Sequence, residues 1–343
     1  MNVLLVTPKY PPDTGGAAEY FKQLADTLTA RGHAVQVLTA VAERTHAGPE
    51  PSGLHRLLPI TYPRRASGLR LLEGVWRQAV LMLALRWAAS HHAVVHIHNS
   101  LAGPWVGSLG RRWNVPLVVD LRDHRRIPDP AGYRGALAVS EELASAARRQ
   151  GLAACALPLP LSSDLPAAGS LPAQRVILYA GQITAAKGAR RFLDAAQRLE
   201  KSGWLEEWGG QAVMVGQAVE GWLPTESARI RYLGALPHAQ LVQVVATAAV
   251  LVLPSDTEGI PRVVAEASAL GVPVLVHGSD DLGPNAAKSL LTSDELAPHN
   301  LAERIRAAVV APPPVLDLSQ RVCRAEDFAA HLFPAYHALG VRL

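Results

Sequence analysis

Apolar runs of strand length alternate with helix-like segments along most of the chain. In the first half the short runs are NVLLVT, HAVQVLTA, AVVHIH, VPLVVDLRD and GALAVS. Between them apolar residues recur every three to four positions, as in AAEYFKQLADTLTARG and in the long amphipathic segment LRLLEGVWRQAVLMLALRWAASHH. Strands that alternate with helices in this way indicate an α/β fold, in which helices cover both faces of a parallel sheet.

The alternation is interrupted once and then begins again. Residues 156–174, ALPLPLSSDLPAAGSLPAQ, are rich in Pro, Ser and Gly, as is typical of a linker. The strand and helix pattern resumes with RVILYAG and continues to PVLVHG. We therefore predict two doubly wound parallel-sheet domains, over residues 1–164 and 165–321. Two such domains leave a cleft that faces the carboxyl ends of the strands, where open α/β sheets bind ligands.

The composition is that of a globular protein. The chain of 343 residues is long enough for two cores, and it is 49% hydrophobic and only 18% charged. Two cysteines, Cys155 and Cys323, do not make a disulfide framework, which suits a reducing cytosol. The amino terminus lacks the features of a signal peptide, and no apolar run approaches the roughly 18 residues that span a bilayer. These features predict a soluble, cytoplasmic protein.

The net charge of +4 hides an asymmetry between the two halves. Residues 1–165 hold 18 Lys and Arg against 12 Asp and Glu, whereas residues 166–343 hold 15 against 17. The basic residues of the first half include Arg64, Arg65, Arg111, Arg112, Arg122, Arg125 and Arg126. A solvated basic surface is the ordinary explanation, and an anionic partner or an anionic membrane surface is the alternative. The low aromatic content of 5% argues against a nucleic-acid partner.

A glycine-containing turn, TPKYPPDTGGAAEY, joins the first predicted strand to the first helix. A dinucleotide site needs Gly-x-Gly-x-x-Gly in a tight turn, but this loop has only Gly15 and Gly16 and is lengthened by three prolines. We therefore expect no NAD or FAD. Backbone N–H groups at the start of a helix favour a negatively charged ligand, and an ordinary connecting loop is the alternative.

Two carboxylates stand out in the window LVLPSDTEGIPRVVAEASALGVPVLV, residues 251–276. Glu258 follows a buried strand, and Glu266 lies eight residues later in a helix that opens near Pro261. Carboxylates at such a strand-to-helix junction suit sugar hydroxyls. A single glutamate there would more often stabilise the helix dipole, whereas two in this frame favour a binding site.

Histidines supply the remaining candidate side chains. His96 and His98 share one side of a strand, and His98 lies closest to its carboxyl end. A structural histidine is the ordinary alternative for His98. The pair His91 and His92, together with His96 and His98, has no supporting carboxylates at a metal-binding spacing, and Asp280 and Asp281 resemble no metal-holding motif. We therefore predict that no metal is required.

Taken together, these segments resemble the retaining glycosyltransferases of the GT-B fold, family 4, also called glycosyl transferases group 1. The resemblance covers nearly the whole chain, through PPDTGGAAEY, VVHIHNSLAG, LAVSEELA, LYAGQITAAKGARRFLDA and YLGALPHAQLVQVVATAAVLVLPS in addition to the two glutamates. It implies two Rossmann-like domains that face a central cleft, an acceptor-side domain first and a donor-binding domain second. It also implies that residues 322–343 return as a helix to the first domain.

The resemblance also implies roles for individual residues. Glu258 would contact the donor sugar, Glu266 the ribose, and His98 the sugar near the reacting carbon. Lys187 would neutralise the leaving diphosphate, over which the Gly15 and Gly16 turn would close. The donor-binding residues would be Gly15, Gly16, Gln182, Lys187, Gly216, Leu236, Ile260, Pro261, Arg262 and Glu266.

The chain departs from the family pattern at two of these positions. Gln182 stands where the family has an arginine, which removes one of two cations from the diphosphate site. Either Arg262 replaces some of that charge, or turnover is slower, or the donor differs. Pro261 lacks the N–H group that a glycine would offer, leaving Ile260 and Arg262 as backbone donors.

The implied function is transfer of a sugar, of the hexosyltransferase type, from a nucleoside-diphosphate sugar to an acceptor hydroxyl with retention of configuration. Neither a cofactor nor a metal is expected. The acceptor, whether a small molecule, a glycan or a lipid-linked compound, would be selected by residues 43–75 and 122–134. A non-catalytic sugar-nucleotide-binding or scaffolding protein is the alternative from another class, with Gln182 as its support. A phosphorylase or a nucleotide-sugar epimerase of the same architecture is the alternative among enzymes.

Overall fold

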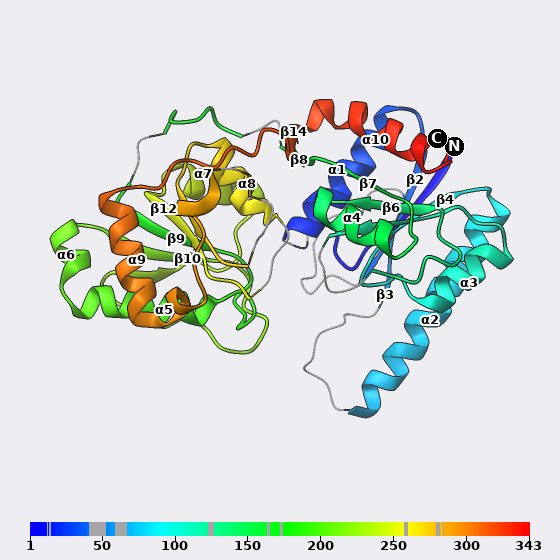
Figure 1. The fold of residues 1–343 in the computed structure, drawn as a ribbon. Helices are drawn as coiled ribbons and strands as arrows, with labels where there is room; N and C mark the ends of the chain where they lie inside the picture. Colours follow the sequence, from blue (N-terminus) through cyan, green and yellow to red (C-terminus); the bar gives the residue numbers. More distant parts are fainter. Residues whose placement is uncertain are drawn as a thin grey trace. The chain divides into compact units, whose positions relative to one another are not determined.

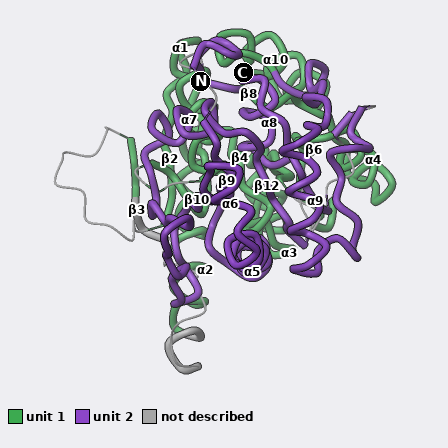
Figure 2. The backbone as a smooth tube through the Cα atoms, turned by 90° about the vertical axis from the view of Figure 1, so that its left-hand side faces the viewer, with its two compact units in different colours: residues 1–160, 323–343 green, residues 161–322 purple. Residues whose placement is uncertain are grey.

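The computed structural model describes most of the chain in two compact units. The described residues are 1–11, 13, 15–40, 53–58, 67–122, 127–162, 165–171, 174–256, 260–278, 282–283 and 285–343. The first unit holds residues 1–160 and 323–343, and the second holds residues 161–322 (Figure 2). Each unit is built on its own parallel sheet.

The first unit contains seven parallel strands in the order β3-β2-β1-β4-β5-β6-β7 (Figure 1). Their bounds are β1 Asn2–Val6, β2 Ala34–Ala40, β3 Leu54–Leu58, β4 Val94–His98, β5 Leu117–Leu121, β6 Gly135–Ala138 and β7 Ala154–Ala156. The order reverses between β1 and β4, so the loops that follow these two strands diverge there. This is the position at which open α/β sheets bind ligands.

Helices flank this sheet. They are α1 Gly16–Ala30, α2 Ser67–Ser90, α3 Pro104–Arg112, α4 Glu141–Arg149 and α10 Phe328–Ala338, preceded by the short η3 Ala325–Asp327. The last helix lies against α1, where the rings of Phe328 and Tyr20 are 6.0 Å apart. Strands β4, β5 and β6 are buried along their whole length, as expected for a parallel sheet with helices on both faces.

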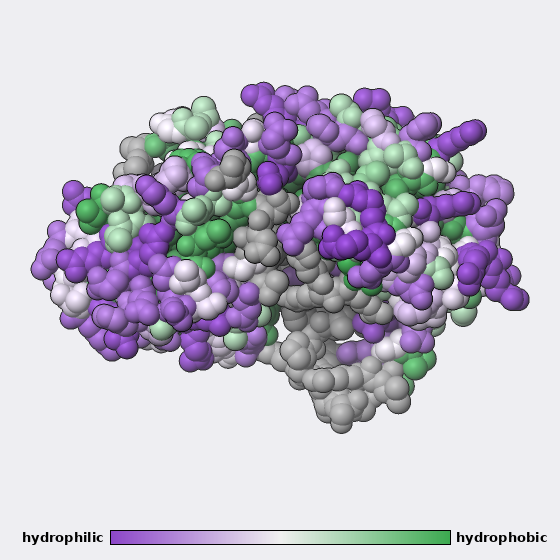
Figure 3. Space-filling view, in the orientation of Figure 1, coloured by the Kyte–Doolittle hydropathy of each residue, from purple (hydrophilic) through white to green (hydrophobic). Residues whose placement is uncertain are grey.

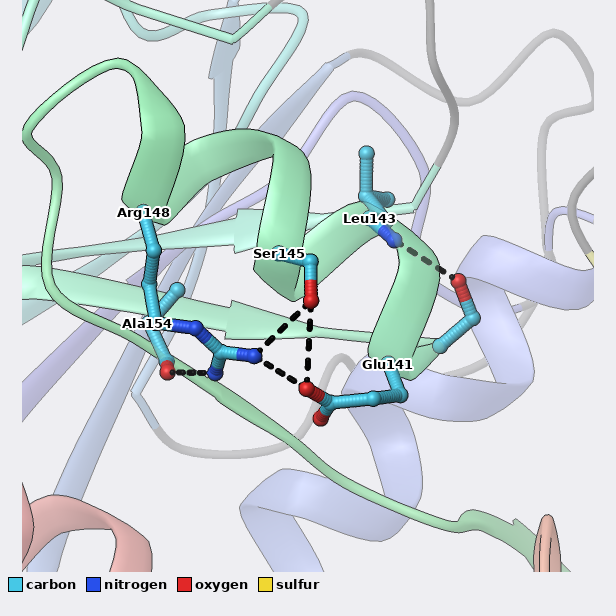
Figure 4. Close-up of polar contacts among 6 residues, drawn as sticks. Glu141, Leu143, Ser145, Arg148 and Ala154 are labelled. Atoms are coloured by element: carbon cyan, nitrogen blue, oxygen red, sulfur yellow. Dashed lines mark hydrogen bonds and ion pairs between the residues drawn. The ribbon is translucent and has the colours of Figure 1, made fainter.

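Helix α4 illustrates how local sequence sets an element (Figure 4). Ser140 caps its start by accepting a hydrogen bond from the Leu143 N–H at 3.2 Å, and two glutamates in the first turn favour the helix dipole. Near the other end, Arg148 donates to the Ala154 carbonyl at 2.9 Å and also contacts Glu141. This arginine therefore ties the helix to the following strand, β7.

The second unit contains five parallel strands in the order β11-β10-β9-β12-β13. Their bounds are β9 Val176–Ala180, β10 Gln211–Val215, β11 Ile230–Tyr232, β12 Val250–Leu253 and β13 Val274–Val276. The helices are α5 Ala189–Lys201, α6 Trp204–Trp208, α7 His238–Ala246, α8 Arg262–Ala269 and α9 Pro298–Val310, with the short η1 Ala286–Lys288 and η2 Asp294–Leu296. The strand order reverses between β9 and β12, which places the switch point of this unit there.

Both sheets confirm the predicted fold class of two Rossmann-like parallel-sheet domains. The stretch predicted as a linker, residues 156–174, contains the short strand β8 Leu159–Leu161, which pairs with β14 Val322–Arg324. Its apolar residues find a partner strand that local sequence does not reveal. Within the described residues, no helix is both long enough and apolar enough to cross a membrane.

Candidate active site

In the first unit, the glycine turn leads directly into α1 at the switch point. Gly15 is the residue before the helix and has φ 127° and ψ 163°, a conformation that side chains disfavour. A Cβ atom built on Gly15 would meet nothing within 4 Å. Glycine is therefore required there by the backbone conformation, and the turn leaves open space beside the start of the helix. Both Gly15 and Gly16 are exposed in this unit.

His98 ends β4, next to the same switch point. It is 7% exposed, and its Nδ1 accepts a hydrogen bond from the Ser100 N–H at 3.1 Å. The Ser100 hydroxyl lies 2.9 Å from the same nitrogen. Because Nδ1 accepts from a backbone donor, the neutral imidazole carries its proton on Nε2. The loop after β4 thus fixes both the tautomer and the orientation of this ring.

His96 faces the same side of the strand but belongs to the core. The Phe21 ring lies 5.8 Å from the His96 ring and 6.0 Å from the His98 ring, which confirms that the two histidines share a face. His96 is fully buried, and its Nδ1 is 2.6 Å from the Tyr336 hydroxyl of α10. His96 is therefore held by the returning helix.

Sequence reasoning missed a buried polar cluster beside these histidines. It consists of Tyr20, His96, Asp120, Arg122 and Tyr336. Asp120 is fully buried, and its Oδ1 lies 3.8 Å from His96 Nε2 and 3.7 Å from Arg122 Nη1. The Arg122 guanidinium lies over the Tyr20 ring, 3.7 Å from its centroid. Asp120 and Arg122 are two residues apart in an apolar strand run, and this spacing was the signal that could have found them.

The electrostatics of this cluster centre on the Asp120 carboxylate. Burial by itself raises the pKa of this carboxyl, but the Arg122 guanidinium, followed by His96, lowers it below its usual value. Burial and the charge of Asp120 raise the pKa of Tyr20 well above its ordinary range. Within the described part of the chain, neither Asp120 oxygen nor the Tyr20 hydroxyl has a hydrogen-bond partner. The ion pair with Arg122 is thus the main compensation for the buried charge.

In the second unit, the loop that follows β9 carries Gln182 and Lys187. The Tyr179 hydroxyl lies 2.8 Å from the Gln182 carbonyl oxygen and 3.2 Å from that of Lys187, so one side chain holds both ends of the loop. Gly216, after β10, has φ 148°, and a Cβ there would lie 1.7 Å from the Gly181 carbonyl oxygen. Glycine at this position therefore allows the loops after β9 and β10 to touch.

The loop after β12 closes against the same region. Gly188, the residue before α5, has φ 70°, and a Cβ there would lie 2.0 Å from the Pro254 carbonyl oxygen. The Asp256 N–H donates to the Ala186 carbonyl at 2.9 Å. The Lys187 loop is thus packed onto the end of β12, at the switch point of this unit.

Glu266 is a buried carboxylate of this unit that two side chains hold in place. It lies in α8, is 1% exposed, and accepts hydrogen bonds at Oε1 from Arg262 Nε at 2.8 Å and His238 Nε2 at 2.7 Å. Among the described residues, no donor reaches its other oxygen. The glutamate is therefore clamped through one oxygen by α7 and by its own helix, with the second oxygen available to a ligand.

Three of the other predicted donor-binding residues lie at the start of α8, and one lies before α7. Ile260 is buried, Pro261 caps the helix with φ −64° and ψ 130°, and Arg262 is its first residue. Leu236 is partly buried in the loop before α7, outside the regular elements. Glu258 lies outside the described residues, as do Asp280 and Asp281 and most of residues 43–75.

Each unit has a surface hollow at the opposite ends of its strands, the amino ends. One is lined by Arg175, Gln211 and Arg229 near the amino ends of β9 to β11, and the other by Arg111 and Tyr133 near those of β5 and β6. The predicted site residues lie at the carboxyl ends, so these hollows are not candidates for the same site. In the described ranges, no cluster of three or more His, Cys, Asp or Glu side chains could hold a metal ion.

Two family models match the chain. Residues 15–165 match the glycosyl transferase 4-like domain, and residues 174–309 match the glycosyl transferases group 1 domain. Glycogen synthase from Mycobacterium tuberculosis is 24% identical over 358 residues, covering 88% of this chain and 84% of that protein.

Solved structures share the fold. Sucrose-phosphate synthase from Thermosynechococcus elongatus has a TM-score of 0.68 at 17% identity, covering 98% of this chain and 96% of that one. HepE from Anabaena, solved in complex with UDP, has a TM-score of 0.60 at 15% identity, covering 99% and 96%. The two family models and the shared two-sheet architecture confirm the resemblance seen in the sequence, and the chain belongs to the family 4 (group 1) glycosyltransferases of the GT-B fold.

Proposed function

We propose that this glycosyltransferase moves a sugar from a nucleoside-diphosphate sugar to an acceptor hydroxyl with retention of configuration and without a metal ion. The observation that carries the proposal is Glu266, a buried carboxylate clamped by Arg262 and His238 so that one oxygen is left for a ligand. A ribose offers two adjacent hydroxyls as donors to such an oxygen. The UDP bound to HepE supports a nucleoside diphosphate as the leaving group.

The diphosphate site is proposed at the loop that follows β9. Lys187 supplies a point charge, and the start of α8 supplies backbone N–H groups and a favourable dipole. In this proposal the guanidinium of Arg262, whose Nε donates to Glu266, also contributes its positive charge near the phosphate. Gln182 offers an amide in place of a second full charge.

The proposed reaction is a front-face displacement. The bond between the anomeric carbon and the phosphate oxygen breaks while the acceptor oxygen bonds to the same face of that carbon. The leaving phosphate oxygen takes the acceptor proton, and Lys187 with Arg262 stabilises the negative charge that develops on the diphosphate. Glu258 orients the sugar, and His98 supports the sugar or the acceptor through Nε2.

A panel of nucleoside-diphosphate sugars, ranked by thermal shift, tests the donor half of the proposal, because a bound ligand raises the stability of the folded state. For the donor selected, release of free diphosphate should be slow without an acceptor and faster with one, and NMR of the product should show the anomeric configuration of the donor. Glu258→Gln should bind the diphosphate normally but lose about 10²-fold in turnover.

The rival function, a non-catalytic binder, predicts a thermal shift with no release of diphosphate under any condition. A product of inverted configuration would contradict the proposed mechanism. Normal turnover in Glu258→Gln would remove that residue from the site.

A further inference from the structure

The second unit has a hollow at the amino ends of β9, β10 and β11, which we call the amino-end hollow. Its volume of about 340 Å³ falls within the range of small-molecule sites, roughly 300–1,000 Å³. The described residues that line it include Arg175, Arg229, Gln174 and Gln211, and none of them is Asp or Glu. The lining is therefore rich in hydrogen-bond donors and positively charged.

The two arginines flank the central strand of this hollow. Arg175 directly precedes β9, and Arg229 directly precedes β11. Both strands pair with β10, one on each side of it. Because neighbouring strands lie about 4.8 Å apart, the Cα atoms of the two arginines are roughly 10 Å apart. Two long side chains at this separation can reach one group that lies between them.

Backbone contacts hold both arginines at these positions. Glu200 of α5 accepts at Oε1 from the Arg229 N–H at 2.9 Å and from the Ser227 hydroxyl at 2.7 Å. On the other side, the Arg175 carbonyl accepts from the Gln211 N–H at 2.9 Å. The two arginines are thus carried by rigid elements of the unit.

Two glycines leave room for the Arg175 side chain. Gly209 has φ 68°, and a Cβ there would lie 2.8 Å from Arg175 Nη1. A Cβ on Gly210 would lie 2.2 Å from the Trp208 ring. A side chain at either position would displace its neighbour, so the glycine pair keeps this wall of the hollow as bare backbone.

Most of the donors at the hollow are unused within the described part of the chain. Arg175 Nη1 donates to the Trp208 carbonyl at 2.6 Å, but the Arg229 side chain makes no hydrogen bond or ion pair with a described residue. A guanidinium has five N–H donors in a fork that matches the oxygens of a phosphate. The hollow therefore offers two such forks to a ligand.

The charge of the hollow differs from that of its surroundings. Residues 166–343 hold 15 Lys and Arg against 17 Asp and Glu, so this half of the chain is slightly acidic. A single exposed arginine is ordinary on a protein surface, but two that flank one hollow without a carboxylate in its lining concentrate positive charge. Such a local excess favours an anionic ligand.

We propose that the amino-end hollow binds a phosphorylated small molecule, at a site separate from that of the donor. The phosphate would accept hydrogen bonds from Arg175 and Arg229, and the amides of Gln174 and Gln211 would contact hydroxyls on the rest of the molecule. The residues predicted to bind the donor follow the carboxyl ends of the strands, so a ligand at the amino ends is not the donor. This inference does not depend on the function proposed above.

Calorimetric titration of the full chain tests the proposal with three phosphate esters: glucose 6-phosphate, glycerol 3-phosphate and 3-phosphoglycerate. At least one ester should bind with a Kd of about 1 mM or lower and more tightly than inorganic phosphate, whereas glucose and glycerol should not bind. Arg229→Gln should weaken binding of that ester by about tenfold, since it removes a charge-assisted contact, and the further change Arg175→Gln should weaken it again. Arg229→Gln is the decisive variant, because its side chain holds no described residue in place.

A matched control removes the same charge elsewhere in this unit. Arg198→Gln with Arg231→Gln changes exposed arginines of α5 and β11 that do not line the hollow, and this variant should bind the ester as the wild type does. Lys187→Gln, in the loop predicted to bind the diphosphate, should also bind it normally. Circular dichroism and the thermal midpoint establish that each variant is folded.

Four results would overturn the proposal. They are that no ester binds, that inorganic phosphate binds as tightly as the esters, that the folded Arg229→Gln variant binds normally, or that the double control or Lys187→Gln loses as much affinity as Arg229→Gln.

Discussion

At the scale of single residues, the two candidate sites are defined by buried polar side chains whose partners come from distant parts of the chain. Glu266 is held by a histidine 28 residues earlier, and His96 by a tyrosine 240 residues later. Each of these hydrogen bonds holds its side chain in one orientation. Three predictions concern single residues.

The first concerns His238, which positions Glu266. His238→Ala should weaken binding of the selected nucleoside diphosphate by about five- to tenfold, because it removes a hydrogen bond to a charged group. His238→Gln should restore part of the affinity, since its amide can donate to the same oxygen. Glu266→Ala should cost more than either, and turnover at saturating donor should change little.

Calorimetric titration measures these affinities. His299→Ala, an exposed histidine of α9, is the control and should bind normally. If His238→Ala also binds normally, Glu266 does not depend on α7 for its orientation.

The second prediction concerns the departure from the family at Gln182. Gln182→Arg should tighten diphosphate binding by roughly 1.5–3 kcal/mol through an added charge-assisted contact. Arg262→Ala should weaken binding, both by loss of charge and by release of Glu266. The two effects should be non-additive because both act on one phosphate group. Titration of the single and double variants measures this coupling, and effects that simply sum would place Gln182 away from the diphosphate.

The third prediction concerns Asp120. Asp120→Asn should lower the free energy of unfolding by about 3 kcal/mol at neutral pH, because it leaves the Arg122 charge without its partner. The pKa of Asp120 is lower in the folded state, so its contribution is fully present above its unfolded pKa of about 3.9 and is lost as the pH falls through the folded pKa.

Urea unfolding between pH 7 and pH 3 measures both effects. The acid loss of stability should be smaller in Asp120→Asn than in the wild type. Asp26→Asn is the matched control, since that carboxylate is 61% exposed in an i,i+4 pair with Lys22. It should change stability by at most about 0.5 kcal/mol. An equally small effect for Asp120→Asn would show that the buried ion pair is not needed.

At the scale of elements, glycines allow the loops at the second switch point to meet. Gly188→Ala should destabilise the protein by about 3 kcal/mol, because it combines a left-handed backbone with a clash against the Pro254 carbonyl. Gly203→Ala is the matched control: it has φ 77° but open space around its Cβ, so only about 1 kcal/mol is expected. Equal losses of stability in urea would mean that the contact with Pro254 contributes nothing.

The elements themselves were largely predictable. The alternation of apolar runs and helical periods indicated all five strands of the second sheet and β1, β2, β4, β5 and β6 of the first, because parallel strands are buried on both faces and read as continuous apolar runs. The edge strands β3 and β7 of the first sheet were missed. Strand β8 within the predicted linker was missed because its three residues have no period of their own and depend on pairing with β14.

At the scale of the whole molecule, the proposed chemistry uses side-chain cations and a helix terminus where other transferases use a divalent metal. Activity should therefore survive treatment with excess EDTA, measured as diphosphate release with the selected donor and acceptor. The same preparation incubated with Mg²⁺ or Mn²⁺ is the comparison. Full inactivation by EDTA that either ion reverses would contradict the assignment of charge stabilisation to Lys187 and Arg262.

The sequence alone determined the fold class and the family, because hydrophobic periodicity and short glycine, lysine and glutamate motifs are local properties of the chain. It also singled out His98, Lys187 and Glu266. Their roles, like that of Glu258, stay predictions.

Only the tertiary structure decided which polar groups meet. The contacts of Asp120 with His96, of Arg122 with the Tyr20 ring, and of Glu266 with His238 join side chains from separate strands and helices, and no local period encodes these meetings. The same holds for α2: its sequence contains apolar residues on both sides, but only packing against the sheet determined which side is buried.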